Sequence, residues 1–247
     1  LKYVDDIIIT NNSKISIDYL ISKLKTKFSL KDLRPLHYFL GIQVQRDIDG
    51  NLHLNQTKYI ANLLTRQNML TTKPVKTPLA SSCKLVSNGT IKAFDPALYK
   101  SVVGALQYTT ITRPDIAYTM NKLYHFMHKP LEEHWKSTKR VLRYLAGTLD
   151  YGLHFKASQP LDISGYSDFD WAADPTNMKS TTCYCLYLGS NIISWQPNKQ
   201  KVLSQSSTEE EFSSLASLSA KISYIQSLLN ELQIPLKRTP IVWCDNM

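Results

Sequence analysis

The sequence predicts a mixed protein of the α+β or α/β class, built from more than one domain. Short β-prone segments alternate with helix-period apolar stripes along all 247 residues. The charge also changes along the chain, because residues 1–156 hold 23 Lys and Arg against 11 Asp and Glu, whereas residues 157–247 hold 6 against 9. We therefore expect three regions, 1–55, 56–157 and 158–247, of which the first two are suited to a polyanionic partner.

Composition argues against a membrane-spanning protein, a secreted protein and a zinc- or disulfide-stabilised protein. No apolar run approaches the ~20 residues of a membrane span, and no secretory leader is recognisable. The four cysteines form no C-x-x-C pair, which favours buried thiols in a reducing compartment over disulfides or a zinc site. We expect an intracellular protein, cytoplasmic or nuclear, without a membrane partner.

The first region begins with "LKYVDDIIIT", which predicts two short strands closing on Asp5 and Asp6. Helix-period spacing follows over residues 13–28. The segments "YFLGIQVQR" and "NLHLNQ" are β-prone and flank "DIDG", whose Asp-Gly pair is a strong turn signal. A hairpin is therefore expected there.

The second region is predicted to be helical. Helical spacing returns over residues 56–69, and an irregular connection rich in Thr, Ser, Lys and Pro follows over 71–98. We expect two further helices, one over about 99–128 with a break near "TRPD" and one over 131–146.

One face of the last of these helices is basic. Lys136, Lys139, Arg140 and Arg143 have the spacing i, i+3, i+4 and i+7, which places them together. Such a face is either an ordinary solvated surface or a phosphate contact. The excess of positive charge in the surrounding region favours phosphate contact.

In the third region, three β-prone segments predict a meander. A long helix near 206–232 then allows the strand "IVWC" to join the same sheet in parallel.

Three carboxylates of this region depart from the apolar pattern. Asp168 lies on the strand face opposite Ile163, Glu211 lies on the inward stripe of the long helix, and Asp245 follows the last strand.

Each of these carboxylates has an ordinary explanation, as a strand-edge, helix-start or loop residue. Their joint placement at matching element ends suggests convergence. Neighbouring carboxylates resist ionising together, because their negative charges repel. A hard cation that prefers oxygen ligands offsets this repulsion. We therefore predict a site for Mg²⁺, which Mn²⁺ could also occupy.

Seven motifs along the chain carry a family resemblance. They are "YVDD", "YFLGIQVQR", "TRPDIAY", "RVLRYLAGTLDYGL", "YSDFDWA", "SSTEEEF" and "CDN". In this order, and over essentially the whole chain, they resemble the Pol polyprotein of copia-type LTR retrotransposons. The resemblance implies a truncated reverse transcriptase palm, thumb and connection, followed by a ribonuclease H-like mixed sheet with helices.

The resemblance also implies roles for individual residues. Asp5, with Asp6 in support, would hold the polymerase metals, and Leu40 and Gly41 of "FLGIQ" would grip the primer. Residues 56–153 would hold the duplex by its backbone. Residues 160–247 would degrade the RNA strand, with Asp168, Glu211 and Asp245 as metal ligands. The implied partners are an RNA:DNA hybrid, a primer–template duplex and the remainder of the Pol polyprotein.

The sequence departs from the family pattern at both ends. No upstream palm aspartate precedes Leu1, and the ribonuclease H tail that follows "CDN" in the family is missing. Cys183 also stands where the family commonly has Gly. We expect a fragment that is inactive as a polymerase in isolation, or else a catalytically dead nucleic-acid-binding remnant of a decayed element.

Overall fold

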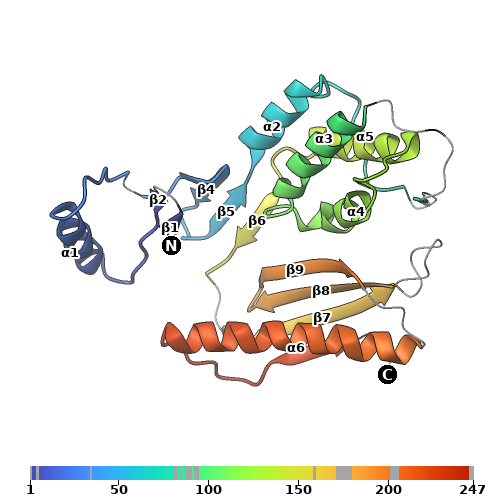
Figure 1. Ribbon diagram of the computed structural model, residues 1–247. Coiled ribbons are helices and arrows are strands. Elements are labelled where there is room, and N and C mark those ends of the chain that lie inside the picture. The colour runs from blue at the N-terminus through green and yellow to red at the C-terminus, as the bar shows by residue number, and fades with distance from the viewer. Residues whose placement is uncertain are drawn as a thin grey trace. The chain divides into compact units, whose positions relative to one another are not determined.

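The computed structural model shows a mixed α/β protein, as expected (Figure 1). It describes residues 2–3, 6–33, 35–80, 83, 85–86, 91, 95–157, 160–170, 180–200 and 206–244. The chain divides into two compact units, residues 1–40 and residues 41–247.

The first unit holds two short antiparallel strands, one helix and a third short strand. Its elements are β1 (Lys2–Tyr3), β2 (Asp6–Ile7), α1 (Lys14–Lys25) and β3 (Tyr38–Phe39). Tyr3 pairs with Asp6, so the backbone of Asp6 opens the second strand instead of lying in the expected turn. The predicted helix is confirmed as α1, which Ser13 caps by accepting a hydrogen bond from the Ser16 amide. No residue of α1 is buried, and Ile15 is 82% exposed.

The second unit contains all the remaining elements. They are β4 (Ile42–Arg46), β5 (Leu52–Asn55), α2 (Thr57–Arg66), α3 (Pro96–Thr109), α4 (Pro114–Tyr124), α5 (Glu132–Ala146), β6 (Gly152–Phe155), β7 (Ile163–Asp170), β8 (Thr181–Leu188), β9 (Asn191–Lys199), α6 (Ser207–Glu231) and β10 (Ile241–Cys244).

Strands β4, β5 and β6 form an antiparallel arrangement in which Gln45, His53 and His154 lie in one cross-strand row. The hairpin expected around "DIDG" is confirmed, and Asp47 holds its turn by accepting hydrogen bonds from the amides of Asp49 and Asn51. The β-prone segment "YFLGIQVQR" contains two strands, β3 and β4, because the two residues before β4 have positive φ angles.

Helices α2 to α5 enclose one hydrophobic core. The expected break near "TRPD" is confirmed, since α3 ends at Thr109 and α4 begins at Pro114. The fully buried members of this core are Ile60, Leu64, Tyr99, Val103, Leu106, Ile116, Met120, Leu123, Val141, Leu142 and Leu145. Burial of such side chains contributes roughly 1.5–3 kcal/mol each and holds the four helices together.

The second sheet has the strand order β10-β7-β8-β9. Strands β7, β8 and β9 form the predicted antiparallel meander, and β10 pairs with β7 in parallel after the α6 crossover, as predicted. Figure 1 shows α6 running along this sheet. Leu218 and Ile222 of α6 pack against Ile163 and Leu186 of the strands.

The cysteines differ from the sequence expectation. All four are free, as expected, but each is partly exposed and none is fully buried. Among the described residues, no helix combines the length and apolar character needed to cross a bilayer.

Two glycines allow a direct test of this packing. A Cβ on Gly152 would lie 2.2 Å from the Leu54 carbonyl oxygen, whereas a Cβ on Gly104 would meet nothing within 4 Å. We expect Gly152→Ala to lower the free energy of unfolding by about 1–3 kcal/mol, because a backbone atom must move. Gly104→Ala, in the exposed interior of α3, should be neutral or stabilising by up to about 1 kcal/mol.

Urea denaturation of both variants and the parent chain measures this difference. Equal midpoints for Gly152→Ala and the parent would contradict the packing of β6 on β5.

Candidate nucleic-acid interface and carboxylate site

The basic face predicted on α5 exists, but part of it is covered. Helix α5 buries Val141, Leu142 and Leu145 on one side, which turns its basic residues outward. Lys136 and Lys139 are exposed. Arg140 and Arg143 are only half-exposed.

The cover is the segment of residues 71–80, which we call the strap. Arg140 donates from Nε to the Thr77 carbonyl oxygen at 3.1 Å and from Nη2 to Thr77 Oγ1 at 2.8 Å. Arg143 donates from Nε to the Lys73 carbonyl oxygen at 2.8 Å. Gly147 faces Pro74 so closely that a Cβ would lie 2.6 Å from it. These long-range contacts were not predicted from the helical spacing.

His134, at the start of α5, holds the chain that follows the strap. Its Nδ1 accepts a hydrogen bond from the Leu131 amide at 3.0 Å, which leaves Nε2–H to donate to the Val86 carbonyl oxygen at 3.1 Å. Burial lowers the pKa of His134 and outweighs the opposing effect of the Val86 carbonyl. The ring is therefore neutral near pH 7 and contributes no charge to the basic face.

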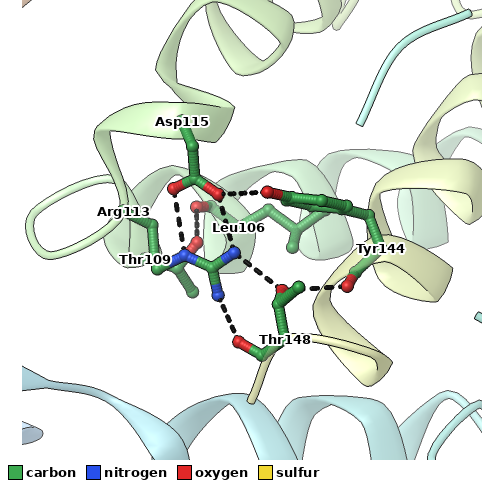
Figure 2. Close-up of polar contacts among 6 residues, drawn as sticks. All are labelled: Leu106, Thr109, Arg113, Asp115, Tyr144 and Thr148. Carbon is green, nitrogen blue, oxygen red and sulfur yellow. Dashed lines mark hydrogen bonds and ion pairs between the residues drawn. The ribbon is translucent and has the colours of Figure 1, made fainter. Parts of the chain in front are cut away.

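The "TRPD" motif forms a buried ionic network that the sequence analysis did not predict (Figure 2). Arg113, only 1% exposed, donates to Asp115 from Nε at 3.0 Å and from Nη2 at 2.7 Å. The same guanidinium donates to the carbonyl and hydroxyl oxygens of Thr148, each at 2.8 Å. It also lies 5.5 Å from the Tyr144 ring centroid and 5.4 Å from that of Tyr151.

Electrostatics within this network favour the ionised pair. Burial opposes ionisation of Asp115, but the hydrogen bonds and charge of Arg113 and a hydrogen bond from the Tyr144 hydroxyl keep the pKa of Asp115 below its ordinary value. Burial and the neighbouring carboxylate raise the pKa of Tyr144. Since every partner is satisfied, the cluster serves the structure and leaves no group for chemistry.

Glu211 lies in the first turns of α6, where its side chain is half-buried. Its Oε1 accepts a hydrogen bond from the Cys244 thiol at the end of β10, at 3.3 Å. The helix begins with a cap at Ser206, which accepts from the Glu209 amide. The inward placement expected for Glu211 thus has a specific partner on the last described strand.

Asp168 is placed differently. On β7, Ser167 hydrogen-bonds to Ser214 of α6, and a Cβ on Gly165 would touch Leu218 of α6. Because side chains alternate along a strand, the Asp168 side chain projects from the sheet face opposite the one that α6 covers. It is exposed, and its Oδ1 accepts a hydrogen bond from the Phe169 amide at 2.8 Å.

The side chains of the other predicted carboxylates lie outside the part of the chain that the structure describes. Asp5 and Asp245 lie outside the described residues, as does the side chain of Asp6. Within the described part of the chain, no three His, Cys, Asp or Glu side chains are grouped closely enough to hold a metal ion. The oxygen donors of Asp168 and Glu211 suit Mg²⁺ in kind, but a complete ligand set is not present among these residues.

Leu40 and Gly41, the predicted primer contacts, have φ angles of 46° and 74°. Gly41 needs this freedom, and a Cβ there would also lie 3.3 Å from the Tyr108 ring. Their role toward a primer stays a prediction.

Comparison with known proteins places the chain in a family. Residues 2–81 match the family model described as "Reverse transcriptase (RNA-dependent DNA polymerase)". The whole chain is 47% and 48% identical to the retrovirus-related Pol polyproteins from transposons RE2 and RE1 of Arabidopsis thaliana. It is 44% identical over 225 residues to an uncharacterized mitochondrial protein of the same plant, covering 91% of this chain and 92% of that protein. The chain belongs to the copia-type Pol polyprotein family.

The chain spans 17% of the length of the RE1 and RE2 Pol polyproteins. No solved structure matches it. These matches confirm the resemblance to copia-type Pol polyproteins that the seven motifs indicated. They also confirm the relation to reverse transcriptase.

The Arg113–Asp115 pair predicts a pH-dependent stability difference. Because the folded pKa of Asp115 lies below the unfolded value of about 3.9, its contribution is fully present above that unfolded pKa. The contribution is lost as the pH falls through the folded pKa. At pH 7, Asp115→Asn should lower the free energy of unfolding by about 1.5–3 kcal/mol, the usual value of a charged hydrogen bond.

Urea denaturation between pH 3 and pH 8 tests this expectation, with the exposed Asp150→Asn as control. The deficit of Asp115→Asn should shrink below about pH 4. A deficit that is independent of pH would show that Asp115 does not act through its charge.

Proposed function

We propose that this chain is the part of a copia-type Pol polyprotein that binds an RNA:DNA hybrid and hydrolyses its RNA strand, as a ribonuclease H. The second sheet carries this proposal. Parallel pairing sets Cys244 beside Ser167, and these residues precede Asp245 and Asp168 in the sequence. Cys244 also contacts Glu211. The backbone register therefore supports proximity of Asp168 and Asp245, and the contact with Cys244 supports proximity of Glu211 to the same end of the sheet.

In this proposal Asp168, Glu211 and Asp245 would hold Mg²⁺ or Mn²⁺. Such ions, when bound in pairs, activate a water and stabilise the leaving oxygen of a phosphodiester. The chain would supply the ligand oxygens. The Cys244 thiol would orient the Glu211 carboxylate by donating to Oε1, and the carboxylate would keep Oε2 as a ligand oxygen.

The region 56–157 would hold the hybrid by its phosphates. It contains 15 Lys and Arg against 5 Asp and Glu, and α5 exposes Lys136 and Lys139. Arg140 and Arg143 add positive charge at the edge of the strap. Such contacts are independent of base sequence and weaken with salt.

The polymerase function would belong to the intact polyprotein. There the hairpin of β1 and β2 would bring Asp5 and Asp6 to the metals of the palm, and Leu40 and Gly41 would contact the primer of a primer–template duplex. The chain described here would act together with the remainder of the Pol polyprotein.

The second candidate is a nucleic-acid-binding remnant without catalysis. The placement of Asp168 favours it, because this side chain is exposed and starts from the sheet face opposite α6, which carries Glu211. Hydrolysis decides between the two candidates.

A cleavage assay on a labelled RNA:DNA hybrid tests the proposal. We expect cleavage of the RNA strand with Mg²⁺ or Mn²⁺, and a loss of at least about 100-fold in Glu211→Gln, because a metal ligand loses its charge. Asp168→Asn should behave alike. Glu231→Gln, at the exposed end of the same helix, is the matched control and should keep full activity.

Full activity in Asp168→Asn would remove that residue from the site. Hybrid binding without any cleavage in the parent chain would favour the catalytically inactive candidate.

A further inference from the structure

A shallow, open pocket lies beside α5, at the end of the strap. Its volume is about 420 Å³, within the range of small-ligand sites. It is lined by Met69, Ala80, Cys83, Lys136, Ser137, Lys139, Arg140 and Arg143. We call it the α5 pocket.

The α5 pocket concentrates positive charge. Four of its eight lining residues are cationic and none is acidic. None of these four forms an ion pair with a carboxylate among the described residues. Like charges held this close repel one another, so an anion in the pocket would relieve the repulsion.

The two arginines are held in place for such an anion. The strap occupies Nε and Nη2 of Arg140 and Nε of Arg143. Nη1 of Arg140 and both Nη atoms of Arg143 therefore have no protein partner in the described part of the chain. A guanidinium fixed in this way loses little further freedom when it binds a phosphate.

Neutral donors complete the lining. Ser137 Oγ and Cys83 Sγ lie 3.4 Å apart, and one hydroxyl or thiol can turn toward a bound oxygen. Lys139 is steadied over the Trp135 ring, 5.4 Å from its centroid. The pocket thus offers both fixed and adjustable donors.

The strap determines which anion fits. Because it already occupies three donors of Arg140 and Arg143, these side chains keep only their remaining Nη donors, which suffice for a single phosphoryl group beside Lys136 and Lys139. We propose that the α5 pocket binds a terminal phosphoryl group, either the 5′-phosphate of a strand or that of free pyrophosphate. This inference deepens the proposed function and rests on its assignment of the α5 face to phosphate binding.

Calorimetric titration of the full chain with pyrophosphate tests the pocket. The double variant Lys136→Gln/Lys139→Gln removes two exposed charges and spares the arginines that hold the strap. We expect it to bind pyrophosphate at least about tenfold more weakly, since two cations that face the anion are removed. Lys100→Gln, an exposed lysine on α3, should bind like the parent.

Short single strands with a 5′-phosphate or a 5′-hydroxyl distinguish the two sources of the ligand. Tighter binding of the phosphorylated strand, lost in the double variant, assigns the pocket to a strand end. Equal binding of both strands, with pyrophosphate still bound, assigns it to free pyrophosphate.

If pyrophosphate does not bind, or binds equally well to the double variant, the proposal that the α5 pocket binds phosphate is wrong. Titration with an RNA:DNA hybrid then separates this failure from that of the proposed function. Hybrid binding retained by the parent chain leaves the proposed function standing, and its absence removes both. Circular dichroism confirms that each variant is folded.

Discussion

The helical region depends on the buried guanidinium of Arg113. A cation this deeply buried would be very costly without partners. Asp115, Thr148 and two aromatic rings supply those partners, from both the α3–α4 turn and the end of α5. The network therefore fixes the direction in which α5 leaves the core. That direction in turn sets which side chains of α5 face the strap.

The same turn joins the helical region to the second sheet. The Thr110 carbonyl oxygen accepts a hydrogen bond from the Trp195 indole of β9 at 3.2 Å. Asn121 of α4 donates to the Pro197 carbonyl oxygen on the same strand at 3.1 Å. The sheet that carries Asp168 is thus attached to the region that carries the basic face. Binding and cleavage of one hybrid would require this attachment.

Periodicity in the sequence was enough to predict the helices, the hairpin after residue 41 and the parallel last strand, since these follow from local spacing and connection length. It could not predict that Leu40 would adopt a positive φ, because the surrounding structure, and not local spacing, determines that conformation. Nor could spacing show that Arg140 and Arg143 bind a strap some 60 to 70 residues away. For the carboxylates, alternation correctly separated Asp168 from the apolar face, and the Cys244 partner of Glu211 emerged only from the fold.

The proposed hydrolysis requires that Asp168, Glu211 and Asp245 converge on a metal. Paramagnetic broadening by Mn²⁺ detects such convergence, because it reports proximity to the ion without requiring turnover. In a spectrum of the backbone amides, we expect substoichiometric Mn²⁺ to broaden the signals around residues 168, 211 and 244–246 first. Broadening spread evenly over exposed carboxylates, or confined to one of these three segments, would contradict it.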